Sequence, residues 1–297
     1  MNQANEKLEN WIQLQIGKEV RKTSPLKGGV SSVISHHLLD DQSSVVSRQI
    51  LNKEWLAEEP DLIIHERASL LALSREDLPV PTFLAADANA EECDAPSLLM
   101  STLPGKAQLE LSVYEAGMVQ LAKTLYRIHQ TPIPSDFPWK YASYTPIQEL
   151  KVPNWTTNPD DWKKALHFVQ HSTPSFTPVF IHRDYHPTNI LWEDGKLSGV
   201  VDWINACNGP ALVDVAHCRT NFALLYGVDT ADSFLIAYLN ENPMDYTPYW
   251  DILSVFDFVD EEMEVYEGWT DLGYTELSSS LMKSRAKDYI RYLCQFI

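Results

Sequence analysis

Three segments within about the first hundred residues have the composition of β-strands. The stretch that ends at Leu39 and residues 44–50 are rich in apolar residues, and the polar residues 40–42 separate them, which favours two neighbouring strands joined by a turn. Residues 97–105 begin as an apolar run and end in Pro-Gly, which indicates a buried strand that runs into a loop. We therefore expect a β-rich N-terminal region.

Beyond this region the pattern changes to that of helices. Hydrophobic residues recur at helical spacing at Met118, Leu121, Leu125 and Ile128, so one face of this helix is expected in the core. Strands followed by helices predict an α+β protein. The length of 297 residues is enough for two lobes with a sizeable core.

A β-hairpin is predicted later in the chain. Residues 189–192 and 197–201 have the composition of strands, and an Asp-Gly pair lies between them. If the hairpin is centred on that pair, Asn189 lies opposite Val200, and Asp202 is brought to the same open end. Two polar side chains that are distant in sequence are thus expected to lie near one another.

Asp184, Asn189 and Asp202 form the residue set that an ATP-dependent phosphoryl transfer needs. The first carboxylate takes the proton of the accepting hydroxyl, and the Asn oxygen and the second carboxylate hold Mg2+ on the phosphates. Mg2+ takes oxygen ligands and usually retains waters, so these two side chains and nucleotide phosphates make a plausible shell. We therefore expect Asp184 to be catalytic and Asn189 and Asp202 to bind the metal.

A glycine-rich turn upstream is a candidate phosphate cradle. Gly28 and Gly29 precede Ser31 and Ser32, just before the first predicted strand. Such a turn lets backbone N–H groups approach phosphates, and the two hydroxyls add donors. No Gly-Lys-Ser/Thr follows, so this is not a Walker A loop. Gly-Gly is also a common turn without a ligand.

Four short segments carry a family resemblance: His182 to Asn189, Asp202-Trp203, Gly209-Pro210 and Asp214-Val215-Ala216. Together they resemble the aminoglycoside phosphotransferase family of kinase-like small-molecule kinases, which is related to choline and homoserine kinases. The resemblance covers roughly residues 25–240. It implies that Asp184 is the catalytic base, that Asn189 and Asp202 are Mg2+ ligands, and that Asp214 is a structural residue beneath the catalytic loop.

The same resemblance implies a bilobal protein-kinase-like fold. Its small β-rich lobe, residues 1–103, would bind the nucleotide, and its mainly helical lobe, residues 104–297, would carry catalysis and the substrate. The hinge between the lobes would lie at about 100–104, where backbone groups near Ser101 and Leu103 would bond adenine.

Arg48 stands where kinases usually carry a phosphate-binding Lys, and Glu66 on the following helix is its expected ion-pair partner by resemblance. Arg keeps the positive charge and binds phosphate oxygens bidentately. The alternative is a surface pair that contributes little.

The histidines of the motif admit other interpretations. His182, Asp184 and His186 alternate on an extended segment and could face one metal ion, but no second His/Cys group of matching spacing follows. A buried His182 that braces the loop is the favoured interpretation. Arg183 and His186 could contact phosphate or substrate, or could bond backbone carbonyls, and we place neither in the catalytic set.

The chain after Asp202 leaves little room for a peptide platform, because Asp214 follows within twelve residues. A small molecule with a hydroxyl acceptor is therefore the favoured substrate. The segment 241–276 holds eleven acidic and no basic residues, which could bind a polycationic amino sugar by charge and stacking. The candidate substrate residues are Asp260, Glu261, Glu262 and Trp269. Alternatively, the helical spacing of Phe256, Val259, Met263 and Tyr266 predicts an amphipathic helix with its carboxylates in water.

Composition narrows the class of partner. The net charge of −18 disfavours nucleic acid, and no apolar run approaches the length of a membrane span. The polar start and four scattered cysteines favour a cytoplasmic protein. The oligomeric state is not predicted.

The predicted reaction is transfer of the γ-phosphate of ATP, with Mg2+, to a hydroxyl of a small molecule, and an aminoglycoside-like cation is one candidate acceptor. A metabolic kinase of the choline, homoserine or sugar type is the alternative. A nucleotide-binding regulator without chemistry is a third hypothesis.

Overall fold

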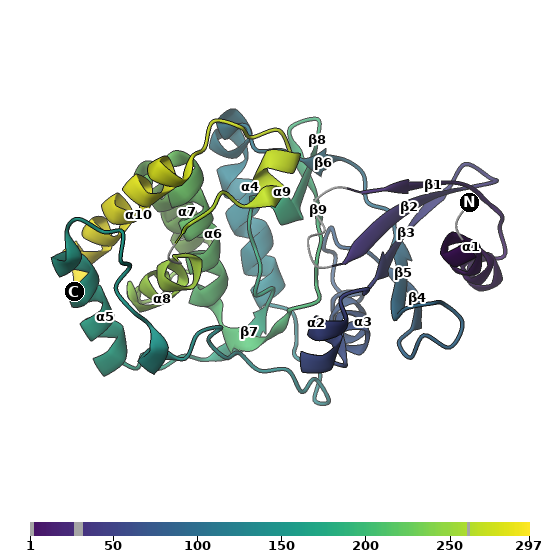
Figure 1. The fold of residues 1–297 in the computed structure, drawn as a ribbon, viewed down its shortest axis with the longest axis horizontal. Coiled ribbons are helices and arrows are strands. Elements are labelled where there is room, and N and C mark those ends of the chain that lie inside the picture. The colour runs from purple at the N-terminus through teal and green to yellow at the C-terminus, as the bar shows by residue number, and fades with distance from the viewer. Residues whose placement is uncertain (1–2, 27–31, 260–261) are drawn as a thin grey trace.

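A five-stranded antiparallel sheet forms the first part of the molecule (Figure 1). This computed structural model describes residues 3–26, 32–259 and 262–297. The strand order is β1-β2-β3-β5-β4. The bounds are β1 Val20–Pro25, β2 Val33–Leu39, β3 Ser44–Gln49, β4 Phe83–Asp87 and β5 Ser97–Ser101. The strands expected before Leu39 and at 44–50 and 97–105 are therefore present.

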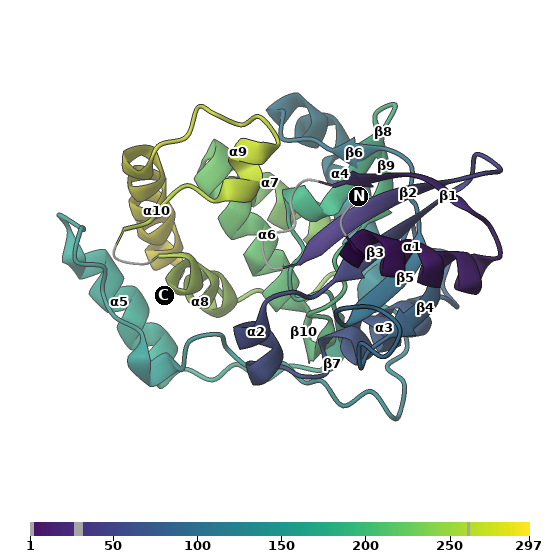
Figure 2. The ribbon, with the colours of Figure 1, turned by 45° about the vertical axis from the view of Figure 1, so that its right-hand side comes forward.

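Helices cover both faces of this sheet. On β5, Leu99 points to one face and belongs to a small core that includes Trp11 and Ile12 of α1 (Gln3–Ile16). Its neighbours Leu98 and Met100 point to the other face and join the main core with residues of α3 (Leu62–Leu73), because side chains alternate along a strand. Figure 2 shows α1 lying in front of the sheet. The short helix α2 spans Lys53–Glu58.

The second part is mainly helical, and its helices lie on the side of the molecule away from α1 (Figure 1). The helix expected from its apolar spacing is α4, and all four of those residues are buried. The helices are α4 Leu111–His129, α5 Pro159–His171, α6 Ala211–Tyr226, α7 Val228–Glu241, α8 Tyr249–Phe258, α9 Glu267–Asp271 and α10 Ser279–Leu293, with 3-10 turns η1 Ile147–Glu149, η2 Pro187–Asn189 and η3 Cys294–Phe296. No helix among the described residues is long and apolar enough to cross a membrane.

Two small sheets complete this part, and residues 182–189 connect them. One pairs β7 (Pro178–Ile181) with β10 (Cys207–Pro210). The other has the order β6-β8-β9, with β6 at Lys106–Ala107, β8 at Ile190–Glu193 and β9 at Lys196–Val200. The β-sheet first part and the helical second part confirm the predicted α+β, kinase-like fold class.

The predicted hairpin is present as β8 and β9, but its register differs by one residue. Ile190, not Asn189, lies opposite Val200, because the register shifts between Leu191 and Trp192. The pairs next to the turn, Glu193 with Lys196 and Trp192 with Leu197, are centred on Asp-Gly as predicted. Beyond them Ser198 is an extra, unpaired residue on β9, which makes a β-bulge. Asn189 belongs to η2, and its carbonyl accepts the Val201 N–H at 3.0 Å. The bulge therefore brings Asp202 opposite the η2 turn.

The continuous amphipathic helix suggested by the spacing of Phe256, Val259, Met263 and Tyr266 does not form. Helix α8 ends at Phe258, and α9 begins at Glu267. Part of the acidic segment is structural: Asp251 in α8 is 2% exposed, and its carboxylate lies 2.6 Å from Nη1 of Arg219.

Candidate active site

Asp214 fixes the loop that follows β7. One oxygen of its buried carboxylate accepts the His182 N–H and the other accepts the Arg183 N–H, each at 2.7 Å. The oxygen bonded to His182 also lies 3.1 Å from Nε2 of His129. These bonds hold Arg183 at φ 74°, a conformation that a non-glycine residue adopts at some cost. Asp214 is thus the structural residue beneath the loop that the motif implied.

His182 braces the same loop, as expected. It is fully buried, its Nε2 lies 3.0 Å from the Val201 carbonyl, and its Nδ1 accepts the Asp184 N–H at 3.2 Å. The ring therefore connects the loop to the end of the hairpin.

Arg183 is buried and held by other groups of the protein. It donates to the Ala142 carbonyl at 2.8 Å, and its guanidinium lies 4.6 Å from the ring centre of Tyr141 and 3.8 Å from that of Tyr144. Of the two interpretations of Arg183, the structure favours the bond to a backbone carbonyl. The aromatic residues come from the long loop between α4 and α5, which therefore borders the catalytic loop.

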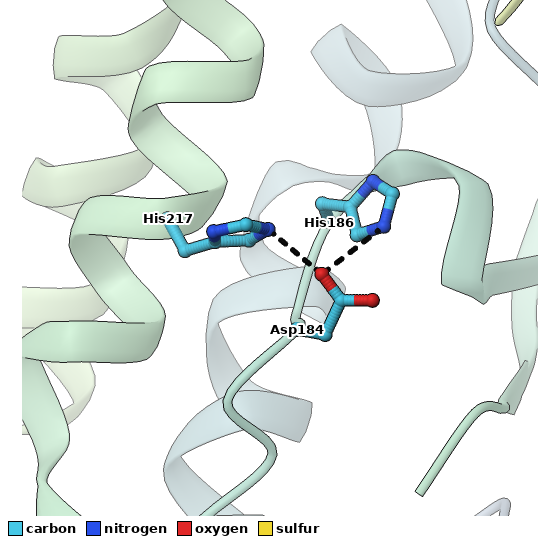
Figure 3. Close-up of side chains that lie close together, drawn as sticks. All are labelled: Asp184, His186 and His217. Atoms are coloured by element: carbon cyan, nitrogen blue, oxygen red, sulfur yellow. Dashed lines mark ion pairs between the residues drawn. The ribbon is translucent and has the colours of Figure 1, made fainter. Parts of the chain in front are cut away.

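The carboxylate of Asp184 is held on three sides. Its Oδ1 lies 3.0 Å from Nε2 of His217 and 3.5 Å from Nε2 of His186, and its Oδ2 accepts from Nδ2 of Asn189 at 3.0 Å (Figure 3). Burial alone would raise the pKa of Asp184, but His186 and His217 lower that pKa well below its ordinary value. The Asp184 side chain remains 27% exposed. An ionised, oriented carboxylate is therefore accessible here.

His217 was missed by the sequence analysis, although a signal for it exists. It follows Asp214 by three residues in α6, and residues three apart share a face of a helix. Once Asp214 is placed beneath the catalytic loop, His217 must lie on the same side, one turn further along. No local motif marks it, because its partner Asp184 lies on another element.

Asn189 and Asp202 converge at the open end of the hairpin and fit a Mg2+ site. Nδ2 of Asn189 donates to both the carbonyl and Oδ2 of Asp184, at 2.9 and 3.0 Å. Within the described residues, the amide oxygen of Asn189 and Oδ2 of Asp202 accept no hydrogen bond, so one oxygen of each is available. These are the hard oxygen donors that Mg2+ prefers. Their role as metal ligands stays a prediction.

Arg48 joins the first part of the molecule to the catalytic hairpin. Its Nε lies 2.9 Å from Glu66, its Nη2 lies 2.9 Å from Asp202 Oδ1, and its Nη1 donates to Ser32 Oγ at 2.8 Å. The predicted Arg48–Glu66 pair is confirmed, and it is buried, which excludes the surface-pair alternative. Burial raises the pKa of Glu66 to about 7, against the opposing effect of the Arg48 charge. The pairing of Arg48 with Asp202 was not predicted.

The structure describes only some of the other residues that are predicted to bind the nucleotide. Gly28, Gly29 and Ser31 lie outside the described residues. The Ser101 N–H donates to the Thr82 carbonyl at 2.9 Å and so is already used. Leu103 follows the end of β5, and within the described residues its N–H has no backbone partner. The adenine role of this segment stays a prediction, with Leu103 the better candidate for the donor.

The structure describes two of the four candidate substrate residues, Glu262 and Trp269. Asp260 and Glu261 lie outside the described residues, and Glu262 is exposed. Trp269 is fully buried, so its ring offers no face to a stacked ligand, which argues against the expected role.

Other aromatic side chains lie near the histidines that contact Asp184. The Tyr266 ring centre is 6.4 Å from that of His186, and the Phe258 ring centre is 5.3 Å from that of His217. Tyr266 and Tyr144 are 37% and 58% exposed. The rings of Tyr266 and Phe258 therefore lie beside the two histidines that contact Asp184.

Part of this chain is similar to curated proteins. Homoserine kinases from two strains of Rhodopseudomonas palustris are 34% identical over 77 residues, a match that covers 24% of this chain and 24% of the relative. The chain thus matches about a quarter of the length of these curated relatives.

Solved structures share the whole fold at low identity. Aminoglycoside phosphotransferase APH(4)-Ia superimposes with a TM-score of 0.64 at 15% identity, covering 97% of this chain and 98% of that one. One structure of a thermostable mutant of that protein is a ternary complex with ADP and hygromycin B. Macrolide 2'-phosphotransferase type I gives a TM-score of 0.61 at 16% identity, with 97% of each chain covered.

The family model described as "Phosphotransferase enzyme family" matches residues 22–252, which include the sheet, the catalytic loop, the hairpin and α6. The chain therefore belongs to the phosphotransferase enzyme family.

Proposed function

We propose that the protein transfers the γ-phosphate of ATP to a hydroxyl of a small molecule. The observation that carries this proposal is the arrangement around Asp184. Its ionised carboxylate is exposed on one side, and the available oxygens of Asn189 and Asp202 lie at the adjoining end of the hairpin. Phosphoryl transfer needs this combination of a proton acceptor and metal ligands, and little other chemistry from the protein.

Asp184 accepts the proton of the acceptor hydroxyl and orients that oxygen. His217 holds the carboxylate from α6, and Asn189 holds it from η2, so its orientation is set before the substrate arrives. Asn189 and Asp202 would hold Mg2+. When bound, that ion neutralises negative charge on the transferring phosphates.

The nucleotide would lie between the sheet and the hairpin. Residues 1–103 form the proposed nucleotide lobe and 104–297 the catalytic lobe, with the hinge at about 100–104. Arg48 is held by Glu66 and contacts Asp202, one of the proposed metal ligands, so its charge lies where phosphates would bind. On phosphate binding its Nη groups would exchange protein partners for phosphate oxygens. Gly28, Gly29, Ser31 and Ser32 are the proposed cradle.

An aminoglycoside-like cation is the first candidate acceptor. It is supported by the fold of the aminoglycoside phosphotransferase neighbour and by exposed rings next to Asp184, because cationic sugars bind aromatic faces. Asp257 adds an acidic group nearby, and burial raises its pKa to about 6. Homoserine, or another small metabolite with an amino group, is the second candidate, favoured by the 34% match to homoserine kinases.

ADP release from Mg-ATP tests the proposal. We would measure it with a panel of aminoglycosides, macrolides, choline, homoserine and sugars, using wild type, Asp184→Asn and the control Asp229→Asn. Asp229 lies in the first turn of α7 and is exposed, and within the described residues its side chain contacts none of Asp184, Asn189 and Asp202. Acceptor-dependent turnover that persists in the control and disappears in Asp184→Asn is expected. Turnover that survives Asp184→Asn would refute the role of Asp184, and Mg-ATP binding without turnover on any acceptor would support the non-catalytic regulator.

A further inference from the structure

Asp184, His186 and His217 form a cluster with the composition of a transition-metal site. One potential ligand atom from each lies within 4.8 Å of the others. The residues come from two elements: Asp184 and His186 lie on the catalytic loop, and His217 lies on α6 (Figure 3). The sequence pattern allowed a metal ion between His182, Asp184 and His186 of the loop. The structure instead replaces His182, which faces the hairpin, with His217.

We propose that Asp184, His186 and His217 bind one divalent transition-metal ion such as Zn2+. Two imidazoles and one carboxylate are three of the four ligands of a typical open zinc site. Zinc bonds of about 2.0–2.1 Å in a tetrahedron place neighbouring ligand atoms about 3.3 Å apart. The distances from Asp184 Oδ1 to the two Nε2 atoms are 3.0 and 3.5 Å. Two of the three distances are thus near the tetrahedral value, and all three ligand atoms lie within 4.8 Å of one another, so side-chain shifts of the histidines would complete the geometry.

The surroundings supply support for such an ion. Thr188 Oγ1 lies beside the His186 ring, 3.2 Å from Nδ1 and 3.3 Å from Nε2. Metal-binding histidines usually bond a partner through their other ring nitrogen, so Thr188 would serve Nδ1 once an ion takes Nε2. Asn189 holds Oδ2 of Asp184 and leaves Oδ1 directed at the histidines. The side chains of His186 and His217 are 7% and 14% exposed, whereas that of Asp184 is 27% exposed. An ion can therefore reach the cluster from the Asp184 side.

This site is chemically distinct from the proposed Mg2+ site. Asn189 and Asp202 offer only oxygen, which suits Mg2+, whereas the cluster offers two nitrogens, which suit Zn2+ or Co2+. An ion on Oδ1 would occupy the carboxylate that the reaction needs. Zinc is therefore expected to inhibit phosphoryl transfer, and this consequence, unlike the binding itself, rests on the proposed function.

Binding is tested with Co2+ as a spectroscopic probe, followed by displacement with Zn2+. The variants are His186→Gln and His217→Gln, because Gln retains a polar group of similar reach. The matched control is His171→Gln, since His167 and His171 have ring centres 4.1 Å apart on α5 and form a possible surface site. Wild type and the control should give the absorption band of a four-coordinate Co2+ site. Both cluster variants should bind at least about tenfold more weakly, because even outer-shell changes cost about 10–100-fold in metal affinity.

Urea unfolding of each variant shows whether it is folded under the binding conditions. If wild type gave no Co2+ band, the proposal would be overturned. It would also be overturned if the band remained in both folded variants, His186→Gln and His217→Gln. A band lost only in His171→Gln would place the ion on α5 and would equally overturn it.

Inhibition is measured as the zinc concentration that halves ADP release at fixed Mg-ATP, with each variant compared with its own zinc-free rate. His217→Gln should need at least about tenfold more zinc than wild type, and His171→Gln should match wild type. Equal inhibition of wild type and His217→Gln would show that zinc acts elsewhere. If no acceptor gives turnover, the Co2+ result still decides the site, so failure of the proposed function and failure of this inference remain distinguishable.

Discussion

Asp214→Asn tests whether a buried carboxylate sets the conformation of the catalytic loop. The native side chain accepts three hydrogen bonds, from the backbone N–H groups of His182 and Arg183 and from His129. Asparagine keeps one acceptor oxygen and places an NH2 group where the other stood. At least one buried N–H would then face another donor.

The magnitude follows from these contacts. A hydrogen bond to a charged group contributes about 1.5–3 kcal/mol, and a buried donor left without a partner costs about 1–3 kcal/mol. Removing the charge also removes its desolvation cost, which offsets part of the loss. Burial alone would raise the pKa of Asp214, yet hydrogen bonds and nearby histidines lower it below its ordinary value, so the site favours the charged form on balance. We expect a net loss of about 2–4 kcal/mol in the free energy of unfolding.

Urea unfolding followed by tryptophan fluorescence measures this change. The matched control is Asp61→Asn, because Asp61 accepts one hydrogen bond, from Trp139 Nε1 at 3.0 Å, and an asparagine oxygen can retain it. The control should lose less than about 1 kcal/mol. If Asp214→Asn were no less stable than Asp61→Asn, the carboxylate would not hold the loop as described.

Three further variants test other parts of the structure. Burial lowers the pKa of His37 from 6.5 to about 4. Because the unfolded chain takes up the proton first, the free energy of unfolding of wild type should fall by up to about 3 kcal/mol as the pH falls from 6.5 to 4. The urea midpoint of His37→Asn should depend less on pH over this range. Gly117→Ala would place a Cβ against the Trp192 ring and should cost about 1–3 kcal/mol despite its better helix propensity; a Tm equal to that of wild type would contradict this packing. Arg219→Met leaves the Asp251 carboxylate buried without its ion pair and should cost about 3–5 kcal/mol; adding Asp251→Leu should recover much of that loss in the same urea assay.

The sequence alone determined the features that depend on local pattern. Helix α4 was visible because its apolar residues repeat with the period of a helix. The hairpin was visible because an Asp-Gly turn divides two strand-like runs. Asp184, Asn189 and Asp202 were recognisable because the chemistry of phosphoryl transfer restricts both residue type and order. The family match confirms the resemblance that these residues carried.

Tertiary structure decided which groups meet. The bulge at Ser198 moved the hairpin register by one residue, because a bulge is an irregularity of pairing and not of composition. The candidate substrate residue Trp269 is buried, because the local sequence does not say which side chains another element covers. His217 reached Asp184, and Arg48 reached Asp202 across 154 positions, only because separate elements pack together. Periodicity and motifs report the local backbone and the required chemistry, whereas contacts between distant segments follow from packing of the whole chain.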